Sequence, residues 1–111
     1  MSNEFIAIGH IQDIPRRGAR CINTAFGRIA VFRTAEDDVF AMDDRCPHKG
    51  GPLSQGLVHG RAVTCPLHNM VISLESGEAL GADEGEVRTY PVRVDDGQLS
   101  IALSALPLAA E

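Results

Sequence analysis

The stretch that decides the fold is residues 46–68, which read CPHKGGPLSQGLVHGRAVTCPLH. It contains two short pairs of metal-binding residue types, Cys46 with His48 and Cys65 with His68. A proline follows each cysteine and restricts the backbone there, which stiffens two tight loops. Each pair is short enough to come from one loop, so two thiolates and two imidazoles can meet at one place. This arrangement indicates a metal site.

Two kinds of occupant suit this mixed donor set. Zinc binds two cysteines and two histidines tetrahedrally, but the familiar zinc finger places both cysteines before both histidines. Here each pair reads Cys then His, so the two cysteines can converge on one iron while the two histidines bind another. A Rieske [2Fe–2S] cluster has this ligand set. The order of the ligands favours such a cluster and one-electron transfer, with a non-redox, zinc-stabilised interaction module or an empty site as the alternatives.

The rest of the chain has the pattern of an all-β protein. Helical periodicity is weak, and short β-type runs are separated by Gly, Pro and Asp, which favours an antiparallel barrel or sandwich. Asp96-Gly97 is a strong signal for a hairpin turn. Pro91 has no N–H to donate, which places it at a sheet edge or outside the ladder. We expect strands over residues 5–9, 19–24, 28–33, 39–43, 62–64, 71–74, 89–94 and 99–103.

The middle of the chain, residues 45–83, is richer in glycine and proline than its flanks. It is predicted to form two loops presented by short strands, and not to contribute a core. A rigid scaffold that displays loops is a common way to build a functional site. We therefore expect a single domain over residues 1–111, with a cluster-binding subdomain at about 45–83.

Composition excludes several classes of function. The chain has 111 residues, of which 44% are hydrophobic, enough for one domain with a modest core. Its formal net charge of −5 disfavours nucleic acid and anionic membranes as partners, because both carry negative charge. No run approaches the roughly 20 apolar residues of a membrane span, and the first residues do not resemble a signal peptide. We expect a cytoplasmic protein.

Residues outside the two pairs give weaker signals. Three cysteines without a secretory signal argue against a disulfide framework, and Cys21 is expected to be a small buried hydrophobe. His10 and His59 are expected to be surface residues in turns. Arg45 and Lys49 flank the first pair, where they are either simply solvated or placed to neutralise the cluster or meet a partner carboxylate.

The spacing Cys46-x-His48-x16-Cys65-x2-His68 resembles the signature of the Rieske family. The resemblance implies a base of antiparallel sheets with a small cluster-binding subdomain at one tip. It also implies that the two histidines bind iron through Nδ1 and leave Nε2 near solvent, where the electron would leave the protein.

A closer resemblance covers most of the chain. The runs CPHKGGPLSQG (46–56), VTCPLHN (63–69), ISLESGEALGADEG (72–85) and RTYPV (88–92) are similar to the small subunit of assimilatory NAD(P)H-dependent nitrite reductase. This implies an electron relay to a large subunit carrying FAD, sirohaem and a [4Fe–4S] cluster, which reduces nitrite to ammonium. No small-molecule substrate site is then expected on this chain. The alternative with the same cofactor is a Rieske ferredoxin that supplies an aromatic-ring-hydroxylating dioxygenase.

The residues around the motif predict a low reduction potential. High-potential respiratory Rieske proteins resemble one another in an extra cysteine in each loop and in a Ser and a Tyr after the second histidine. Here neither loop has a second cysteine, and Met70 and Ile72 stand where those hydrogen-bond donors would be. Fewer hydrogen bonds to the sulfurs lower the potential, so we expect a value near the low end of roughly −150 to +300 mV. A redox titration that gives a potential above zero would contradict this.

Overall fold

The structure is a computed structural model, and it describes residues 5–24, 27–46, 51–66, 70–80 and 85–102. Within these ranges the regular structure consists of ten short strands and two single-turn 3-10 helices, so the all-β prediction is confirmed. None of the helices in the described ranges is long and apolar enough to cross a membrane. The strands form three antiparallel sheets.

The central sheet has the strand order β2-β3-β4-β8. Its strands are β2 (Gly18–Thr24), β3 (Gly27–Arg33), β4 (Val39–Asp43) and β8 (Thr89–Tyr90). The hairpin predicted from residues 19–24 and 28–33 is present as the β2–β3 pair.

Both faces of the central sheet are buried. Successive side chains of a strand point to opposite faces, and here each face packs into a separate core. One core takes Ala30, Phe32 and Met42 from the central sheet. The other core takes Ile29, Val31 and Ala41. The five-residue run from Ile29 to Arg33 is therefore continuously buried. This explains why its first four residues are apolar and why the last, Arg33, needs polar partners.

The second sheet covers one face of the central sheet and has the order β1-β10-β9. Its strands are β1 (Ile6–His10), β9 (Val92–Asp95) and β10 (Gln98–Ile101). Asp96 and Gly97 form the predicted turn with φ of 56° and 86°, as a two-residue hairpin requires. Pro91 separates β8 from β9 and so lies outside the ladder, as expected.

The third sheet lies on the other side, with the order β5-β6-β7. It consists of β5 (Leu57–His59), β6 (Ala62–Thr64) and β7 (Val71–Ser73), and the 3-10 helix η2 (Leu53–Gln55) precedes it. One prediction fails here. His59 was expected in a turn, but it ends strand β5, which pairs with β6, and the turn begins at the next residue, Gly60, whose φ is 59°.

The middle segment also contributes a core, contrary to expectation. Its buried side chains join those of the central sheet in one apolar cluster, because the alternate residues of β6 and β7 face the sheet and the turns lie at the ends. The buried members from this segment are Cys46, Leu53, Val58, Val63, Cys65, Met70, Ile72 and Leu74.

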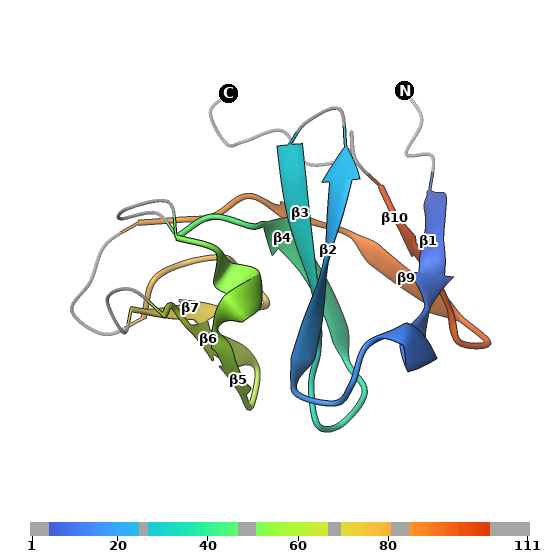
Figure 1. Cartoon of the computed structure of the whole chain (residues 1–111), viewed down its shortest axis with the longest axis horizontal. Coiled ribbons are helices and arrows are strands. Elements are labelled where there is room, and N and C mark those ends of the chain that lie inside the picture. Colours follow the sequence, from blue (N-terminus) through green and yellow to red (C-terminus); the bar gives the residue numbers. More distant parts are fainter. Residues whose placement is uncertain (1–4, 25–26, 47–50, 67–69, 81–84, 103–111) are drawn as a thin grey trace.

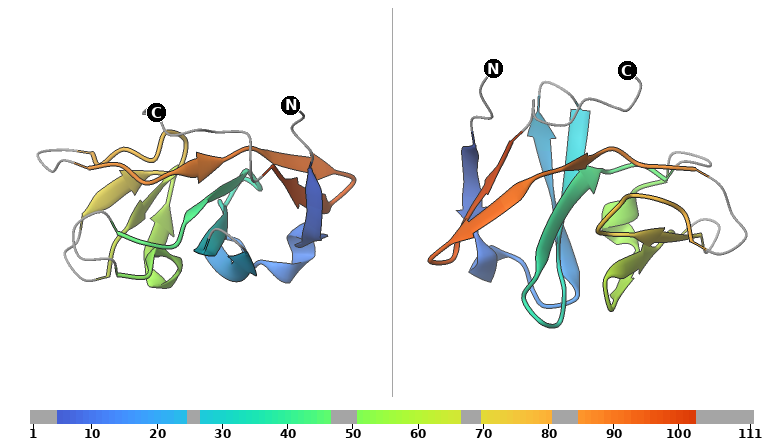
Figure 2. Two further views of the ribbon diagram at one scale, coloured as in Figure 1. Left: turned by 90° about the horizontal axis from the view of Figure 1, so that it is seen from above. Right: turned by 180° about the vertical axis from the view of Figure 1, so that it is seen from behind.

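The three sheets follow one another along the molecule (Figure 1). The β5–β7 sheet and η2 form one end, the central sheet lies in the middle, and β1, β9 and β10 form the other end. The segment from Gly85 to Asp95 runs along this length and connects the two ends (Figure 2). Arg61, in the β5–β6 turn, pairs with Asp38 at 2.7 Å and with Glu75 at 2.5 Å. Because Asp38 lies in the β3–β4 turn, this pair connects the third sheet to the central sheet.

The buried guanidinium of Arg33 has polar partners both beside η1 and in the β3–β4 turn. Its guanidinium donates hydrogen bonds to the carbonyl oxygens of Ile11 (3.1 Å) and Ile14 (2.7 Å), beside the 3-10 helix η1 (Ile11–Asp13). It also pairs with Asp37 in the β3–β4 turn at 2.8 Å, and Arg16 contacts the same carboxylate at 3.0 Å. The hydrogen bonds from Arg16 and then Arg33 lower the pKa of Asp37 to about 2.

This pair of arginines predicts an acid-dependent loss of stability. The folded pKa of Asp37 lies below its ordinary value of 3.8, so its stabilising effect is complete above the unfolded pKa and disappears as the pH falls through the folded one. We expect Asp37→Asn to unfold at lower urea than wild type at pH 7, and the gap to close between about pH 4 and pH 2. Exposed Asp95→Asn is the matched control. A gap for Asp37→Asn that stays constant down to pH 2 would contradict the assignment.

Candidate metal centre

The first predicted ligand, Cys46, lies three residues beyond the end of β4 and is buried. Its backbone N–H donates a hydrogen bond to the carbonyl oxygen of Gly51 at 2.8 Å. This bond closes a six-residue loop, residues 46–51, shortly after the end of β4. His48 belongs to the same short stretch of chain but lies outside the described residues, as does Lys49.

The second predicted ligand, Cys65, directly follows β6 and is fully buried. Its N–H donates to the carbonyl oxygen of Met70 at 2.7 Å, and the pairing of Thr64 with Val71 continues the closure into the β6–β7 hairpin. The two loops are thus built alike, each closed by a bond from the cysteine to the residue five positions on. His68 lies outside the described residues.

Both cysteines belong to the same buried cluster, together with Leu53 and Met70. Two sulfur donors that are withdrawn from water, each with its backbone N–H hydrogen-bonded, suit a thiolate-ligated metal, because thiolate is the ligand that iron–sulfur clusters use. Among the described residues, no group of three or more His, Cys, Asp or Glu side chains could hold a metal ion. The part of the chain that the structure describes therefore contains no rival to the predicted site.

The strand that leads to Cys46 is anchored on two sides by consecutive aspartates. Asp43 accepts a hydrogen bond from the Tyr90 hydroxyl at 2.7 Å, and its N–H donates to the Arg88 carbonyl oxygen at 2.9 Å. Burial, followed by the hydrogen bond to Asp43, raises the pKa of Tyr90 to about 12. The phenol therefore stays protonated and keeps donating throughout the neutral range.

Asp44 points to the other side and is buried among polar groups. Its carboxylate accepts hydrogen bonds from the Ser54 N–H (2.7 Å), the Ser54 hydroxyl (2.9 Å) and the Cys21 thiol (2.7 Å). Arg28 lies 3.3 Å from the same carboxylate and 2.9 Å from the Cys21 sulfur. Cys21 is thus a half-buried thiol in a polar network. Its prediction as a buried hydrophobe is wrong because its polar neighbours are Arg28 on β3, Asp44 just beyond β4 and Ser54 on η2.

A sequence profile of the Rieske-like [2Fe-2S] domain family matches residues 4–102. This chain belongs to the Rieske-like [2Fe-2S] domain family. Its cofactor is a Rieske [2Fe–2S] cluster, which confirms the iron–sulfur prediction over zinc, and its activity is electron transfer. Antiparallel sheets with a small additional sheet are the expected Rieske fold.

Three known proteins are similar to this Rieske protein in sequence or in fold. It is 45% identical over 74 residues to the anthranilate 1,2-dioxygenase ferredoxin subunit of Burkholderia cepacia, covering 66% of this chain and 68% of the other. It is 36% identical over 106 residues to the 3-phenylpropionate/cinnamic acid dioxygenase ferredoxin subunit of Photorhabdus laumondii, covering 94% and 97%. A crystal structure of a candidate NADH-dependent nitrite reductase small subunit from Mycobacterium tuberculosis shares the fold, with a TM-score of 0.84, 23% identity, and coverage of 96% and 100%.

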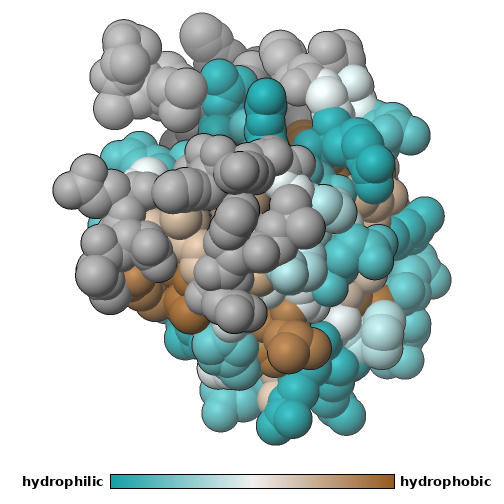
Figure 3. Space-filling model, turned by 60° about the vertical axis from the view of Figure 1, so that its left-hand side comes forward, coloured by the Kyte–Doolittle hydropathy of each residue, from teal (hydrophilic) through white to brown (hydrophobic). Residues whose placement is uncertain are grey.

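The end of the Rieske protein that holds the two cysteine loops has exposed apolar side chains. Leu57 on β5 is 74% exposed, and Leu80, beyond β7, is 45% exposed. Figure 3 shows apolar surface at this end, among polar side chains. Arg45 is exposed beside Cys46, and the acidic side chains of Glu78 and Glu86 are brought together by a β-bridge.

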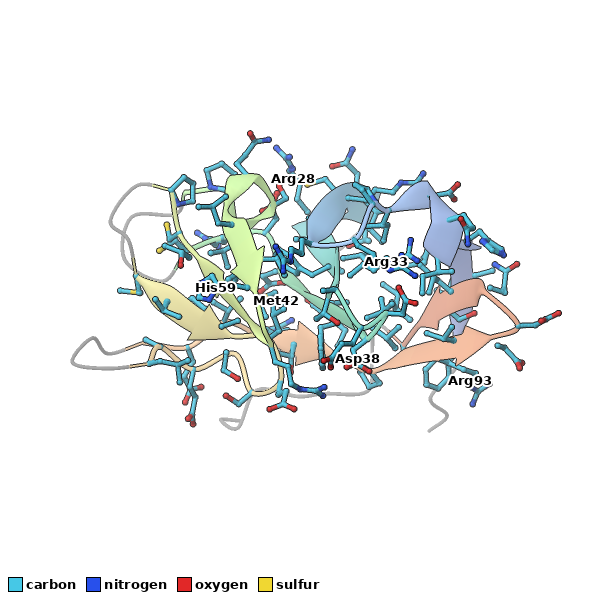
Figure 4. All side chains as sticks on the ribbon, turned by 90° about the horizontal axis from the view of Figure 1, so that it is seen from below. Arg28, Arg33, Asp38, Met42, His59 and Arg93 are labelled. Carbon is cyan, nitrogen blue, oxygen red and sulfur yellow. The ribbon has the colours of Figure 1, made fainter. Side chains whose placement is uncertain are left out.

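The two histidines outside the motif are exposed, as expected, but neither lies in a plain turn. His59 ends strand β5, and its Nε2 lies 2.7 Å from the Thr64 hydroxyl (Figure 4). His10 ends β1 and caps η1, where its Nδ1 accepts a hydrogen bond from the Gln12 N–H at 3.1 Å. Each imidazole ring therefore makes a local hydrogen bond, His10 beside η1 and His59 in the third sheet.

Proposed function

We propose that Cys46, His48, Cys65 and His68 hold the cluster, with the cysteines on one iron and the histidines on the other. The matched closure of the two cysteine loops carries this proposal, since both thiols are buried in one cluster of side chains. Each histidine follows its cysteine by two or three residues, inside the span that the backbone hydrogen bond closes. A Rieske cluster needs two thiolates and two imidazoles, and these pairs supply them.

The protein's own residues support a one-electron carrier. When bound, the cluster takes up one electron and gives it to a partner. Leu53, Met70 and Ile72 are fully buried around the cysteines and exclude water from the sulfur ligands. The loop-closing bonds and the β6–β7 hairpin limit movement of Cys46 and Cys65. Fixed cysteines allow fast transfer because less of the site has to rearrange.

We propose that the electrons go to the terminal oxygenase of an aromatic-ring-hydroxylating dioxygenase. Two dioxygenase ferredoxin subunits are 45% and 36% identical to this chain, and the second of them matches almost the whole length. The exposed Leu57 and Leu80 give the cluster end an apolar contact area suited to a transient protein partner.

The small subunit of assimilatory nitrite reductase is the second candidate. The run 72–85 and the run 88–92, which includes Tyr90, resemble that subunit and favour it. The matching crystal structure is 23% identical, so it supports the fold common to both candidates and not a choice of client. The higher identities to dioxygenase ferredoxins put the oxygenase first, which reverses the order that the sequence runs alone suggest.

Replacing one histidine ligand tests the site. We expect His68→Ala to lose the visible absorbance and the reduced-state EPR signal of a Rieske cluster, because one iron would lack a ligand. The matched control is His59→Ala, which removes an exposed imidazole from β5 and should keep both signals. A Rieske spectrum in His68→Ala would show the ligand assignment to be wrong.

Direct electron transfer tests the client. The chemically reduced protein is mixed in a stopped-flow instrument with the oxidised oxygenase component of an anthranilate 1,2-dioxygenase, or with the large sirohaem subunit of a nitrite reductase. We expect the oxygenase to reoxidise the cluster at least about tenfold faster, the effect of roughly 1.4 kcal/mol in the barrier. Faster reoxidation by the sirohaem subunit would favour the nitrite reductase assignment instead.

A further inference from the structure

The carboxylate of Asp44 is buried and is stabilised there by hydrogen bonds and an ion pair. Its side chain is 0% exposed. A buried carboxylate without partners is strongly unfavourable, yet this one accepts hydrogen bonds from both donors of Ser54 and from Cys21, and Arg28 balances its charge. None of these contacts takes part directly in the proposed electron transfer.

The contacts of Asp44 join the two ends of the first cluster loop, which is residues 44–54 and contains Cys46. Asp44 precedes Cys46 by two residues, and Ser54 follows it by eight, so the bonds between them close a ring around the inner bond from Cys46 to Gly51. The first cluster loop is thus fastened twice, once by backbone alone and once by the carboxylate.

The same carboxylate fixes this ring to the base. Cys21 and Arg28 lie on β2 and β3, and the Asp44 N–H donates to the Arg28 carbonyl oxygen at 3.0 Å. Arg28 lies next to η2 in the molecule (Figure 4). The loop that carries Cys46 is therefore held against the β2–β3 hairpin at both of its ends.

We propose that Asp44 is a positioning residue for the cluster: it holds Cys46 in place by fastening both ends of the first cluster loop to the β2–β3 hairpin. The proposal rests on the proposed role of Cys46 as a ligand and is independent of the client. Its consequence is that the cluster is lost faster when the carboxylate is changed, although Asp44 does not touch the metal.

The site requires an aspartate and not simply a polar or a charged side chain. In Asp44→Asn one acceptor oxygen becomes an NH2 group that faces the guanidinium of Arg28 and the donors of Cys21 or Ser54. Asp44→Glu keeps the charge but adds a methylene to a side chain that is fully buried. Both changes should loosen the loop, whereas an effect of charge alone would appear only in the first.

The experiment measures how fast the holo protein loses its cluster to an iron chelator, followed by the visible absorbance. Wild type is compared with Asp44→Asn, Asp44→Glu and Ser54→Ala. Asp95→Asn, an exposed substitution at the other end of the molecule, removes the same charge as Asp44→Asn and is the matched control. Hydrogen exchange at the Cys46 amide, which is protected by its bond to Gly51, provides a second readout that does not depend on activity.

We expect both Asp44 variants to lose the cluster about 10- to 100-fold faster than wild type, the usual effect of residues that orient metal ligands. Ser54→Ala should accelerate the loss by about fivefold, the effect of one hydrogen bond, and Asp95→Asn should match wild type. The Cys46 amide should exchange faster in the Asp44 variants. A wild-type rate in Asp44→Glu would overturn positioning in favour of charge, and wild-type rates in all variants would overturn the proposal altogether.

Two further comparisons keep the test decisive. If the Asp44 variants do not fold, Ser54→Ala decides, and an unchanged rate of cluster loss in it would overturn the proposal. Cys46→Ala distinguishes this proposal from the ligand assignment. A cluster that persists in Cys46→Ala contradicts the ligand role of Cys46. If Cys46→Ala has no cluster but Asp44→Asn loses its cluster at the wild-type rate, only the role of Asp44 is contradicted.

Discussion

The burial of β3 on both faces is the constraint on which the rest of the structure depends. A strand covered on two sides needs a partner layer on each side, and the chain supplies one from its two termini and one from its middle. The β1-β10-β9 sheet covers the face of Ile29 and Val31, while η2 and the β5–β7 sheet cover the face of Ala30 and Phe32. Cys46 and Cys65, the two proposed cysteine ligands, belong to the same buried cluster as this second layer and are therefore built on the core itself.

The end of β4 shows how this arrangement positions chemistry. Because consecutive side chains of an extended chain point to opposite sides, Asp43 reaches β8 and Asp44 reaches β2, β3 and η2. These contacts fix the direction of the backbone just before Cys46. The second loop is fixed differently, by the ladder of the β6–β7 hairpin. One cysteine is held mainly by side chains of the base, and the other by backbone pairing.

The sequence was sufficient for the features that depend on neighbouring residues. The Cys–His pairs, the Asp96-Gly97 turn and the β2–β3 hairpin are local patterns, and the structure or the family assignment agrees with the predictions made from them. The environment of Cys21 could not be predicted, because it is made by residues 7 to 33 positions away. The same holds for the pairing of Asp44 with Ser54, and for the strand β5, whose three residues become a strand only when β6 lies beside them.

The different anchoring of the two loops has a consequence for how such proteins can diverge. The third sheet meets the base through apolar packing and through Arg61, whose partners Asp38 and Glu75 lie at the surface. Exposed positions at this end of the molecule, such as Leu57 on β5 and Leu80 beyond β7, can therefore be substituted without disturbing the buried polar contacts of Asp44. The surface that the proposed redox partner would contact can therefore change while the attachment of Cys46 to the β2–β3 hairpin stays intact.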